Sequence, residues 1–336
     1  MNFLVTGVAG FIGFHSARRL LAEGHRVVGI DNLSDYYDPA LKQGRLDQLL
    51  GEAGFMFQRM DICDATALAE LVADGDFDRV VHFAAQPGVR HAARDPGAYL
   101  RANLLGFGNL LEACRRAGTP HLVYASTSSV YGASTRVPYS EHGDADHPLS
   151  LYAATKRSNE LMAHAYSALH GLPTTGLRMF TVYGPWGRPD MAPWLFTEAI
   201  LAGRPIEVFN YGQHLRDFTY IDDIVSGVAC VAMGIPAGQA GWDTTSADPA
   251  QSYAPFRLYN IGGTRPVDLN RFIATLESRL GRQAQRVELP LQAGDMPETW
   301  ADCSDLERDY GYRPVTPLEE GINRFVDWYL DWQGRD

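Results

Sequence analysis

The sharpest chemical signal in the sequence is a tyrosine and a lysine four residues apart, Tyr152 and Lys156. Residues at this spacing share one face of a helix, so the two side chains would lie together. A lysine beside a tyrosine stabilises the phenolate and lowers the pKa of the phenol toward a value that is useful for proton transfer near neutrality. The pair therefore predicts an acid–base site, and an ordinary pair on a helix surface is the alternative.

A run of hydroxyl side chains, Ser126 to Ser129, follows a β-rich segment upstream of that pair. At the carboxyl end of a strand such hydroxyls could bind the reacting oxygen of a substrate and pass its proton to Tyr152. A plain polar turn is the alternative reading of the run.

Three glycines in the pattern Gly7-x-x-Gly10-x-x-Gly13 lie between the first β-rich segment and the first helical segment. Such a turn lets the backbone approach a pyrophosphate at the positive end of the helix. The second β-rich segment leads into Asp31, whose carboxylate could accept hydrogen bonds from both hydroxyls of an adenine ribose and would repel a 2′-phosphate. Because residues 32–34 provide no arginine, the pattern favours NAD over NADP. A glycine-rich turn and a solvated aspartate are the alternatives.

Two further turns, Asp61-Ile62 and Ala84-Ala85-Gln86, follow the third and fourth β-rich segments. The carboxyl ends of parallel strands share the edge at which a doubly wound sheet binds its ligand, so we expect adenine and ribose contacts there. Ordinary turns at strand ends fit these residues equally well.

The elements that would position these residues alternate between β-rich and helical segments. The β-rich segments are Phe3–Thr6, Val27–Ile30, Phe55–Phe57, Val80–Phe83 and Leu122–Ala125, and the helical segments are Phe11–Ala22, Ala98–Ala117 and Leu151–Leu169. This alternation predicts an α/β fold with a doubly wound parallel sheet of the Rossmann type, covered by helices on both faces.

We expect two domains. Residues 1–180, with a return segment at about 217–235, would form the cofactor-binding domain. Residues 181–216 and about 256–315 would form a smaller, mixed α/β substrate domain, because the sequence after Pro173 is less regular and richer in Pro, Gly and aromatic residues. Residues 234–255 read as a flexible insertion.

Composition narrows the classes of partner. A net charge of -11 argues against nucleic acid and against an anionic membrane, because both favour basic surfaces. The chain has two lysines, Lys42 and Lys156, so arginines must hold any anionic substrate. Four cysteines without a Cys-x-x-Cys pair indicate neither a metal site nor a disulfide framework. With no room for a signal peptide before Phe3 and no apolar stretch of about 18 residues, we expect a cytoplasmic protein.

Several longer segments are more specific than these short patterns. They are Ala84–Arg90, Tyr124–Gly132, Tyr152–Lys156, Phe180–Met191 and Arg216–Asp223. On these segments the sequence resembles the extended short-chain dehydrogenase/reductases over nearly its whole length, and among them the UDP-glucuronate 4-epimerases. The resemblance implies a bound NAD and a homodimer formed through the helices at 98–117 and 151–169.

The resemblance also implies a role for each matching residue. The catalytic set is Thr127, Tyr152 and Lys156, and Lys156 would also hold the nicotinamide ribose. The implied NAD-binding residues are Gly7, Gly10, Phe11, Ile12, Gly13, Asp31, Asn32, Ser34, Asp61, Ile62, Ala84, Ala85, Gln86, Asn103, Tyr152, Lys156 and Phe180. The implied substrate-binding residues are Pro87, Arg90, Thr127, Ser128, Ser129, Thr181, Arg188, Arg216 and Asp295.

Within the substrate set, Ser128, Ser129 and Thr181 correspond to groups that hold the sugar carboxylate, with Arg188 nearby and Arg216 on the diphosphate. Similar galactose epimerases carry Asn at the position of Thr181 and a second diphosphate arginine near residues 294–295, where this chain has Gln292. The first departure weakens a neutral-hexose assignment, and the second leaves Arg90 as the candidate for that contact. A surface ion pair is the alternative for each arginine.

The implied reaction is C4 epimerisation of UDP-glucuronate. Tyr152 would remove the C4 hydroxyl proton through or beside Thr127 while hydride passes to NAD, and the 4-keto sugar would turn and take the hydride back on its other face. A UDP-glucuronate decarboxylase and a UDP-glucose/galactose 4-epimerase are the nearest alternatives. A 4,6-dehydratase would need an acid–base pair in place of Ser128-Ser129, and a catalytically silent NAD-binding sensor would commonly lack Tyr152 or Lys156.

Overall fold

The computed structural model describes residues 1–243, 245, 247–292 and 296–334, and its centre is a seven-stranded sheet in the order β11-β6-β5-β4-β1-β2-β3. All neighbouring strands in this sheet are parallel. Strands β1 to β6 and β11 span Asn2–Thr6, Arg26–Asp31, Phe55–Arg59, Arg79–His82, Leu122–Thr127, Thr174–Met179 and Phe256–Ile261. The predicted doubly wound parallel sheet is confirmed.

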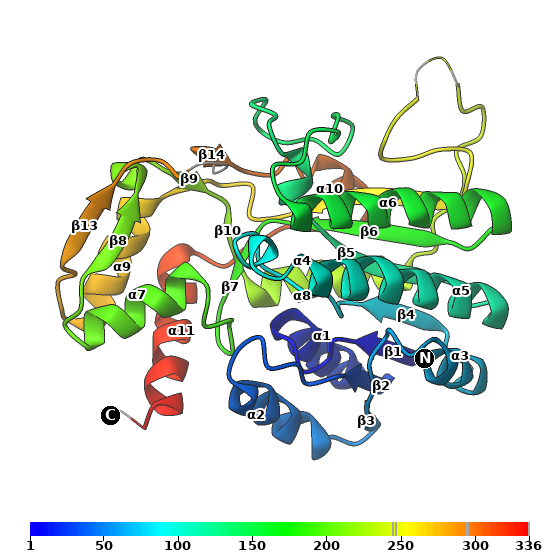
Figure 1. Ribbon diagram of the computed structural model, residues 1–336, viewed down its shortest axis with the longest axis horizontal. Coiled ribbons are helices and arrows are strands. Elements are labelled where there is room, and N and C mark those ends of the chain that lie inside the picture. The colour runs from blue at the N-terminus through cyan, green and yellow to red at the C-terminus, as the bar shows by residue number, and fades with distance from the viewer. Residues whose placement is uncertain (244, 246, 293–295, 335–336) are drawn as a thin grey trace.

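Helices cover both faces of the sheet (Figure 1). On one face α3 (Ala65–Asp74), α5 (Phe107–Ala117) and α6 (Leu151–His170) pack side by side, and on the other α2 (Pro39–Leu50), α1 (Phe11–Ala22) and α8 (Ile221–Met233) do so. Strand β1 shows the reason, because Phe3 and Val5 join one buried apolar cluster while Leu4 between them joins the other. Successive side chains of a strand point to opposite faces, so an all-apolar strand needs cover on both.

Two helices near the centre of the chain carry the predicted chemistry. The segment predicted as one helix at 98–117 consists of α4 (Pro96–Tyr99), a π-helical turn (Leu100–Gly106) and α5. Helix α6 begins after Ser150, whose hydroxyl accepts a hydrogen bond from the Ala153 amide at 3.1 Å, and it ends at Gly171 with φ +67°. Its first two turns therefore present Tyr152 and Lys156.

The rest of the chain builds small sheets at one end of the molecule (Figure 1). Strand β7 (Thr181–Tyr183) pairs with β10 (Phe218–Tyr220), β8 (Ile206–Phe209) pairs with β13 (Arg286–Leu289), and β9 (Leu215–Arg216) lies between β12 (Val267–Asp268) and β14 (Glu298–Thr299). The accompanying helices are α7 (Ala192–Leu201), α9 (Leu269–Leu280) and α11 (Leu318–Trp332), whereas α10 (Ser304–Tyr310) lies against β11 and α8. Short 3-10 turns lie at His91–Ala93, Ser128–Tyr131 and Asn210–Gly212.

One predicted domain boundary is wrong. Residues 256–261, expected in the substrate domain, form β11, which pairs in parallel with all six residues of β6 at the edge of the large sheet. Every residue of β11 is buried. Arg257 and Asn260 interrupt its apolar run, and for that reason the sequence did not indicate a buried parallel strand there.

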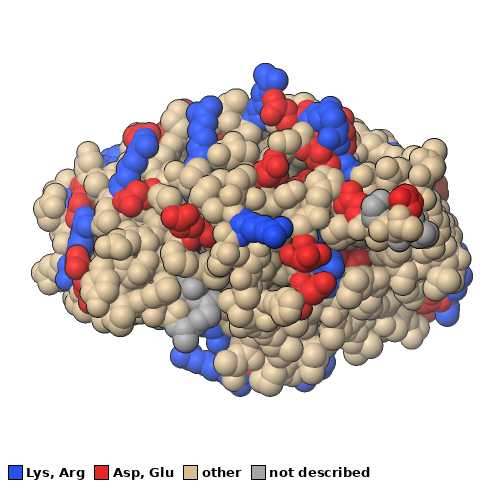
Figure 2. Space-filling model, turned by 90° about the horizontal axis from the view of Figure 1, so that it is seen from above, with Lys and Arg blue, Asp and Glu red and all other residues tan. Residues whose placement is uncertain are grey.

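The surface carries charges of both signs. On the face shown in Figure 2, acidic and basic side chains are interspersed and no wide basic area occurs, in keeping with the net charge of -11. No helix in the described ranges is both long and apolar enough to cross a membrane. The same residues contain no group of three or more His, Cys, Asp and Glu side chains that could hold a metal ion, and all four cysteines are free thiols.

Candidate active site

The glycine motif forms the tight turn between β1 and α1. Gly7 has φ +69°, and a Cβ there would lie 2.6 Å from the Ala84 amide nitrogen. A Cβ on Gly13 would lie 2.2 Å from the Gly7 carbonyl oxygen, and one on Gly10 would lie 2.9 Å from the same atom. No side chain fits at these three positions, so the backbone at the N-terminus of α1 stays accessible to a phosphate.

The acidic residue at the end of β2, Asp31, is fixed by two main-chain hydrogen bonds. The Ala9 amide donates to Asp31 Oδ2 at 3.1 Å and the Leu33 amide donates to Oδ1 at 2.8 Å. The Asn32 side chain donates to Asp61 Oδ2 at 3.0 Å, which joins the ends of β2 and β3. The predicted adenosine-binding residues therefore lie together, and Asp31 touches the glycine turn itself.

Lys42 lies beside this group and was not singled out from the sequence. Its Nζ donates to the Ser34 carbonyl at 2.8 Å and to the Ser34 hydroxyl at 2.9 Å. Burial lowers the pKa of Lys42, while nearby Asp31 opposes that change. The lysine thus holds the predicted cofactor residue Ser34 in place.

Asn103, predicted to bind the cofactor, makes its side-chain hydrogen bonds to protein groups. It accepts from the Gln86 amide at 2.8 Å and donates to the Gln86 carbonyl at 3.1 Å and to the Thr155 hydroxyl at 3.0 Å. The Asn159 side chain donates to the Asn103 carbonyl within the π-helical turn at 2.6 Å. Asn103 therefore ties the turn after β4 to α6, the helix that carries Tyr152.

Tyr152 is half-buried beside Thr127 and Arg188. Burial raises the pKa of Tyr152, and the positive Arg188 and a hydrogen bond with Thr127 oppose that rise. Arg188 is the leading group that opposes the rise, and the influence predicted for Lys156 stays a prediction. The ring of Tyr99 lies edge-on to Tyr152 with 6.2 Å between ring centres.

Lys156 is 2% exposed. Burial lowers the pKa of this lysine to about 8, and Glu160 one helical turn further on opposes the change. No hydrogen bond joins Lys156 Nζ to another residue within the part of the chain that the structure describes. Its ammonium group is therefore available to a ligand such as the cofactor ribose.

The predicted hydroxyl run divides into two parts. Thr127 donates to the Ser129 hydroxyl at 3.2 Å, and its own oxygen accepts from the Ser129 amide at 3.2 Å, which starts the 3-10 turn. Ser126 donates to Glu160 at 2.6 Å instead, and Arg178 binds both oxygens of Glu160 at 2.9 Å each. Thr127 therefore contacts Tyr152, whereas Ser126 is bound to Glu160.

Arg188 forms an ion pair with a residue that the sequence analysis did not name. Its Nε and Nη2 donate to the two oxygens of Asp190 at 2.9 and 2.5 Å, and the Tyr36 hydroxyl donates to the same carboxylate at 3.0 Å. Burial alone would lower the pKa of Arg188, but the pairing with Asp190 outweighs it and the pKa lies above the ordinary value. Arg188 therefore does form an ion pair, which was the alternative to a substrate contact. The pair is not fully on the surface, because the Arg188 side chain is only 22% exposed.

The two arginines predicted to bind the diphosphate each donate a hydrogen bond to a residue in the C-terminal part of the chain. Arg216 Nη1 donates to the Pro297 carbonyl at 3.0 Å. Arg90 Nη2 donates to Gln292 Oε1 at 2.8 Å, so the candidate arginine contacts the position at which the expected second arginine is replaced. Asp295 lies outside the described residues.

The remaining predicted residues lie next to these groups. The Phe180 amide donates to the Ile261 carbonyl at 3.3 Å. Thr181 is the first residue of β7, and its amide donates to the Asp217 carbonyl at 3.2 Å. The Pro87 carbonyl accepts from the Tyr99 hydroxyl at 2.7 Å. Together with the turns after β1 to β5, these residues place nearly the whole predicted site at the carboxyl edge of the sheet, where α/β enzymes bind ligands.

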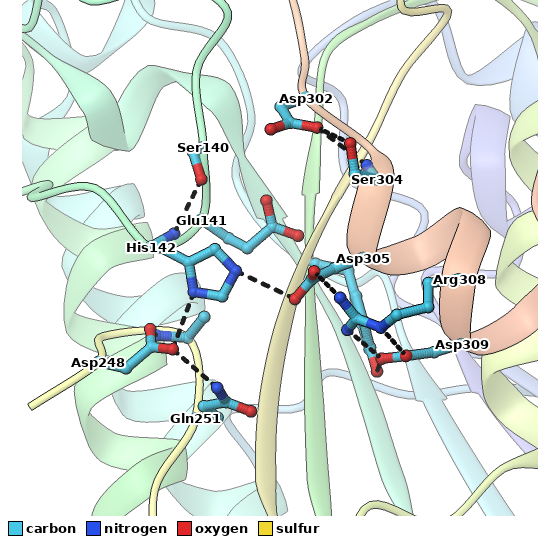
Figure 3. Close-up of polar contacts among 12 residues, drawn as sticks. Ser140, Glu141, His142, Asp248, Gln251, Asp302, Ser304, Asp305, Arg308 and Asp309 are labelled. Atoms are coloured by element: carbon cyan, nitrogen blue, oxygen red, sulfur yellow. Dashed lines mark hydrogen bonds and ion pairs between the residues drawn. The ribbon is translucent and has the colours of Figure 1, made fainter. Parts of the chain in front are cut away.

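A second polar cluster supports the hydroxyl turn, which is the 3-10 turn Ser128–Tyr131 that follows Thr127. Tyr131, the last residue of that 3-10 turn, donates its hydroxyl to the Asn260 side chain at 2.6 Å, and Asn260 Nδ2 donates to Glu141 Oε2 at 3.2 Å. Glu141 is 2% exposed, and burial raises its pKa to about 7. His142 beside it lies between Asp248 and Asp305, as Figure 3 shows.

Sequence reasoning missed Tyr36, Asp190 and Glu160. Asp190 lies inside the segment Phe180–Met191 that was already singled out, and Glu160 lies one turn after Lys156 on α6. An acidic residue two positions from a predicted substrate arginine was a usable signal. For Tyr36 the sequence held no local signal, because its partner Asp190 is 154 positions away.

Comparisons with known proteins agree with this geometry. The sequence model of the NAD dependent epimerase/dehydratase family matches residues 3–245. Protein CapI of Staphylococcus aureus is 48% identical over 332 residues, covering 99% of each chain. A probable UDP-glucuronate 4-epimerase of Rhizobium meliloti is 46% identical over 330 residues, covering 98% of this chain and 97% of the relative. The crystal structure of a UDP-glucuronic acid 4-epimerase from Bacillus cereus with UDP-glucuronic acid and NAD matches with a TM-score of 0.87 at 34% identity, covering 99% of this chain and 100% of the other.

Proposed function

The chain belongs to the NAD dependent epimerase/dehydratase family, and from this membership we propose that it converts UDP-glucuronate to UDP-galacturonate by NAD-dependent inversion at C4. One observation carries the proposal, the grouping of Thr127, Tyr152 and Arg188. That grouping offers a proton acceptor and a lasting positive charge for an anionic sugar. The relatives named as UDP-glucuronate 4-epimerases support the choice of substrate.

The residues around the glycine turn fit NAD. The three glycines leave a cradle that side chains would fill, and Asp31 is held where it can accept ribose hydroxyls. NAD, when bound, takes a hydride from the sugar and returns it. We assign cofactor binding to residues 1–180, 217–235 and 256–261, and UDP-sugar binding to residues 181–216 and 262–315.

Proton transfer falls to Tyr152. Its phenolate oxygen would take the proton of the C4 hydroxyl, and Thr127 beside it would orient that oxygen or relay the proton. Lys156 would hold the cofactor ribose through the Nζ that has no described partner. Arg188 keeps its charge and favours the phenolate form of Tyr152.

The carboxylate of the substrate creates a hazard that the hydroxyl groups can control. A 4-keto uronate is a β-keto acid, which loses carbon dioxide when the carboxylate bond aligns with the carbonyl π system. Ser128, Ser129 and Thr181 are the proposed donors that hold the carboxylate out of that alignment. Replacing Thr181 with Ala should increase the decarboxylated by-product, and an unchanged product mixture would count against this role.

Proton NMR of the purified protein with UDP-glucuronate and no added cofactor tests the proposal directly. Conversion to UDP-galacturonate would establish both the epimerase activity and the retained NAD. Pentose signals would assign a decarboxylase instead. No conversion after addition of NAD, together with turnover of UDP-glucose, would assign a galactose-type epimerase.

We further propose that the protein is a homodimer that pairs through α5, α6 and the π-helical turn. Leu105, Leu161 and Leu169 on these elements are 54%, 58% and 76% exposed, and a second copy would bury them. Sedimentation should give a dimer for the natural chain and a monomer for the Leu161→Glu variant. A monomeric natural chain would reject the dimer. The cytoplasmic location stays a prediction.

A further inference from the structure

The segment that carries Arg188 is held in place by side chains from the first 45 residues of the chain. His15 Nε2, on α1, lies 2.9 Å from the Pro185 carbonyl. Arg45, on α2, donates from Nε and Nη2 to the Trp186 carbonyl at 3.1 and 2.7 Å. Arg45 is fully buried, so water cannot replace these hydrogen bonds.

The backbone of this segment is strained at Trp186, whose carbonyl accepts the hydrogen bonds from Arg45. Trp186 has φ +63°, an uncommon and costly conformation for a large side chain that persists only when the surroundings hold it. The same Arg45 side chain donates from Nη1 to the Ala9 carbonyl in the glycine turn at 2.8 Å. One buried guanidinium therefore joins the cofactor turn to the turn that precedes Arg188.

The last contact reaches Arg188 itself. Tyr36 lies in the loop after β2, a few residues beyond Asp31, and donates to Asp190, which binds the Nε and Nη2 edge of Arg188. A two-point carboxylate contact fixes the plane of a guanidinium as well as its position. Among the described residues Arg188 Nη1 has no hydrogen-bond partner. The edge that remains for a ligand is thus set by Asp190.

We propose that Asp190 and Tyr36 are positioning residues, which hold the Arg188 guanidinium beside Tyr152. Because Tyr36 belongs to the cofactor-binding domain, that domain then sets the geometry of proton transfer. This inference rests on the proposed function. Neither residue needs to touch the reacting atoms, because each acts through Arg188.

The proposal gives a signed expectation for Tyr152. Arg188 opposes the rise of the Tyr152 pKa, so an arginine that swings away should let that pKa rise further. If Asp190 acted only as a nearby negative charge, its removal would instead lower the Tyr152 pKa. The other titratable or charged groups around Tyr152 and Arg188 are Tyr99 with His91 beside it, Arg45 on α2, and Lys156 with its neighbours His82 and Glu160. None of them changes in the variants below.

The experiment compares Asp190→Asn and Tyr36→Phe with the natural holoenzyme. We expect the acid limb of the pH profile of kcat/KM to move to higher pH by about 0.5–1 unit in Asp190→Asn and by less in Tyr36→Phe. At the optimum pH, kcat should fall by about tenfold in Asp190→Asn, and KM for UDP-glucuronate should rise by about threefold. Asp327→Asn, which breaks an exposed pair with Arg279, and Tyr253→Phe at an exposed tyrosine are the matched controls.

A second measurement does not depend on turnover. Tyrosinate absorbance is titrated for each protein and for the same protein carrying Tyr152→Phe, and the difference isolates Tyr152. A shift of this component to higher pH in Asp190→Asn supports the inference, and a shift to lower pH or no shift overturns it. Normal epimerisation with unshifted profiles would overturn the inference alone, whereas a natural chain without epimerase activity would overturn the proposed function and leave the titration as the test.

Discussion

Two polar clusters meet where β5 ends, and they differ in how their buried charges are neutralised. Behind the strand, Ser126 donates to Glu160, and Glu160 binds Arg178 through both oxygens. In front of it, Thr127 faces the candidate active site, in which Lys156 is buried with no hydrogen-bond partner among the described residues. Neighbouring residues of one strand point in opposite directions, so Ser126 and Thr127 have different partners, although Glu160 in one cluster and Tyr152 and Lys156 in the other all lie on α6.

The difference separates support from function. A buried charge that is paired with an opposite charge holds the surrounding chain in place, whereas a buried charge without a hydrogen-bond partner reduces stability and is typical of a site where a ligand supplies that partner. By this argument the rear cluster holds the hydroxyl turn in place, and the front cluster keeps its donors for cofactor and sugar. The predictions that follow test this division.

The largest expected effect is on turnover in the front cluster. Tyr152→Phe removes only the proposed acid–base hydroxyl, so kcat should fall by about 10²–10⁴-fold. The free energy of unfolding should change by less than about 1 kcal/mol, because that hydroxyl holds no buried charge. Steady-state turnover and chemical denaturation measure the two quantities. A variant with a tenth of the natural kcat would remove Tyr152 from the mechanism.

The rear cluster should show the reverse pattern. Glu160→Gln leaves the buried Arg178 without its counter-charge and should lower the free energy of unfolding by about 3–5 kcal/mol. Glu198→Gln is the matched control, because its pair with Arg204 is exposed, and it should change stability by less than about 1 kcal/mol. Urea denaturation of both variants decides the point, and equal losses would show that burial does not distinguish the pairs.

A third prediction concerns the cost of the unpartnered lysine. Burial lowers the Lys156 pKa to about 8 from 10.5. The unfolded chain therefore binds more protons between these values, so the natural protein gains stability as the pH rises through that window. In protein stripped of cofactor, Lys156→Met should be more stable by roughly 3 kcal/mol below pH 8 and should lose that advantage by pH 10.5.

Thermal unfolding of the two proteins from pH 7 to 10 follows this difference, and epimerase activity should be lost in the same variant. A methionine variant that is less stable at neutral pH would mean that Lys156 is a structural residue. The front cluster would then resemble the rear cluster.

The sequence predicted the front cluster better than the rear one. The spacing of Tyr152 and Lys156 placed both on α6, and the glycines and Asp31 lie at the turns where the strand pattern put them. These signals are local, because a helix face or a turn is set by residues a few positions apart. The different roles of Ser126 and Thr127 also follow from strand alternation, although the hydroxyl run was first treated as one group.

The parts that the sequence did not predict depend on distant contacts. Tyr36 and Asp190 are 154 positions apart, and β11 pairs with β6 across the return through α8. Asn103 stays a predicted cofactor residue, and its contacts with Gln86 and Thr155 were not predicted. Only the folded arrangement shows such pairings, because no local period or spacing records them.

The smallest predicted effect concerns Glu141, which lies behind the 3-10 turn Ser128–Tyr131 and which we count with the rear cluster. Glu141 faces Asn260, and burial raises its pKa to about 7 from 4.5, with Asp305 adding to the rise. The folded protein therefore holds this proton more tightly than the unfolded chain, and the resulting stability is complete below pH 4.5 and lost as the pH rises through 7. His142 beside it acts in the same direction, because pairing with Asp248 outweighs burial and raises its pKa.

Glu141→Gln keeps a neutral side chain at every pH and should remove most of the pH dependence of stability that Glu141 causes. Relative to the natural chain, the variant should gain about 2 kcal/mol of stability between pH 5 and pH 8, measured as free energies of unfolding in urea. Glu207→Gln, at an exposed position, is the control and should run parallel to the natural chain. Parallel curves for Glu141→Gln would mean that Glu141 is ionised in the folded protein at pH 5. The rear cluster would then contain an unpaired buried charge of its own, and incomplete pairing would no longer mark the functional side of β5.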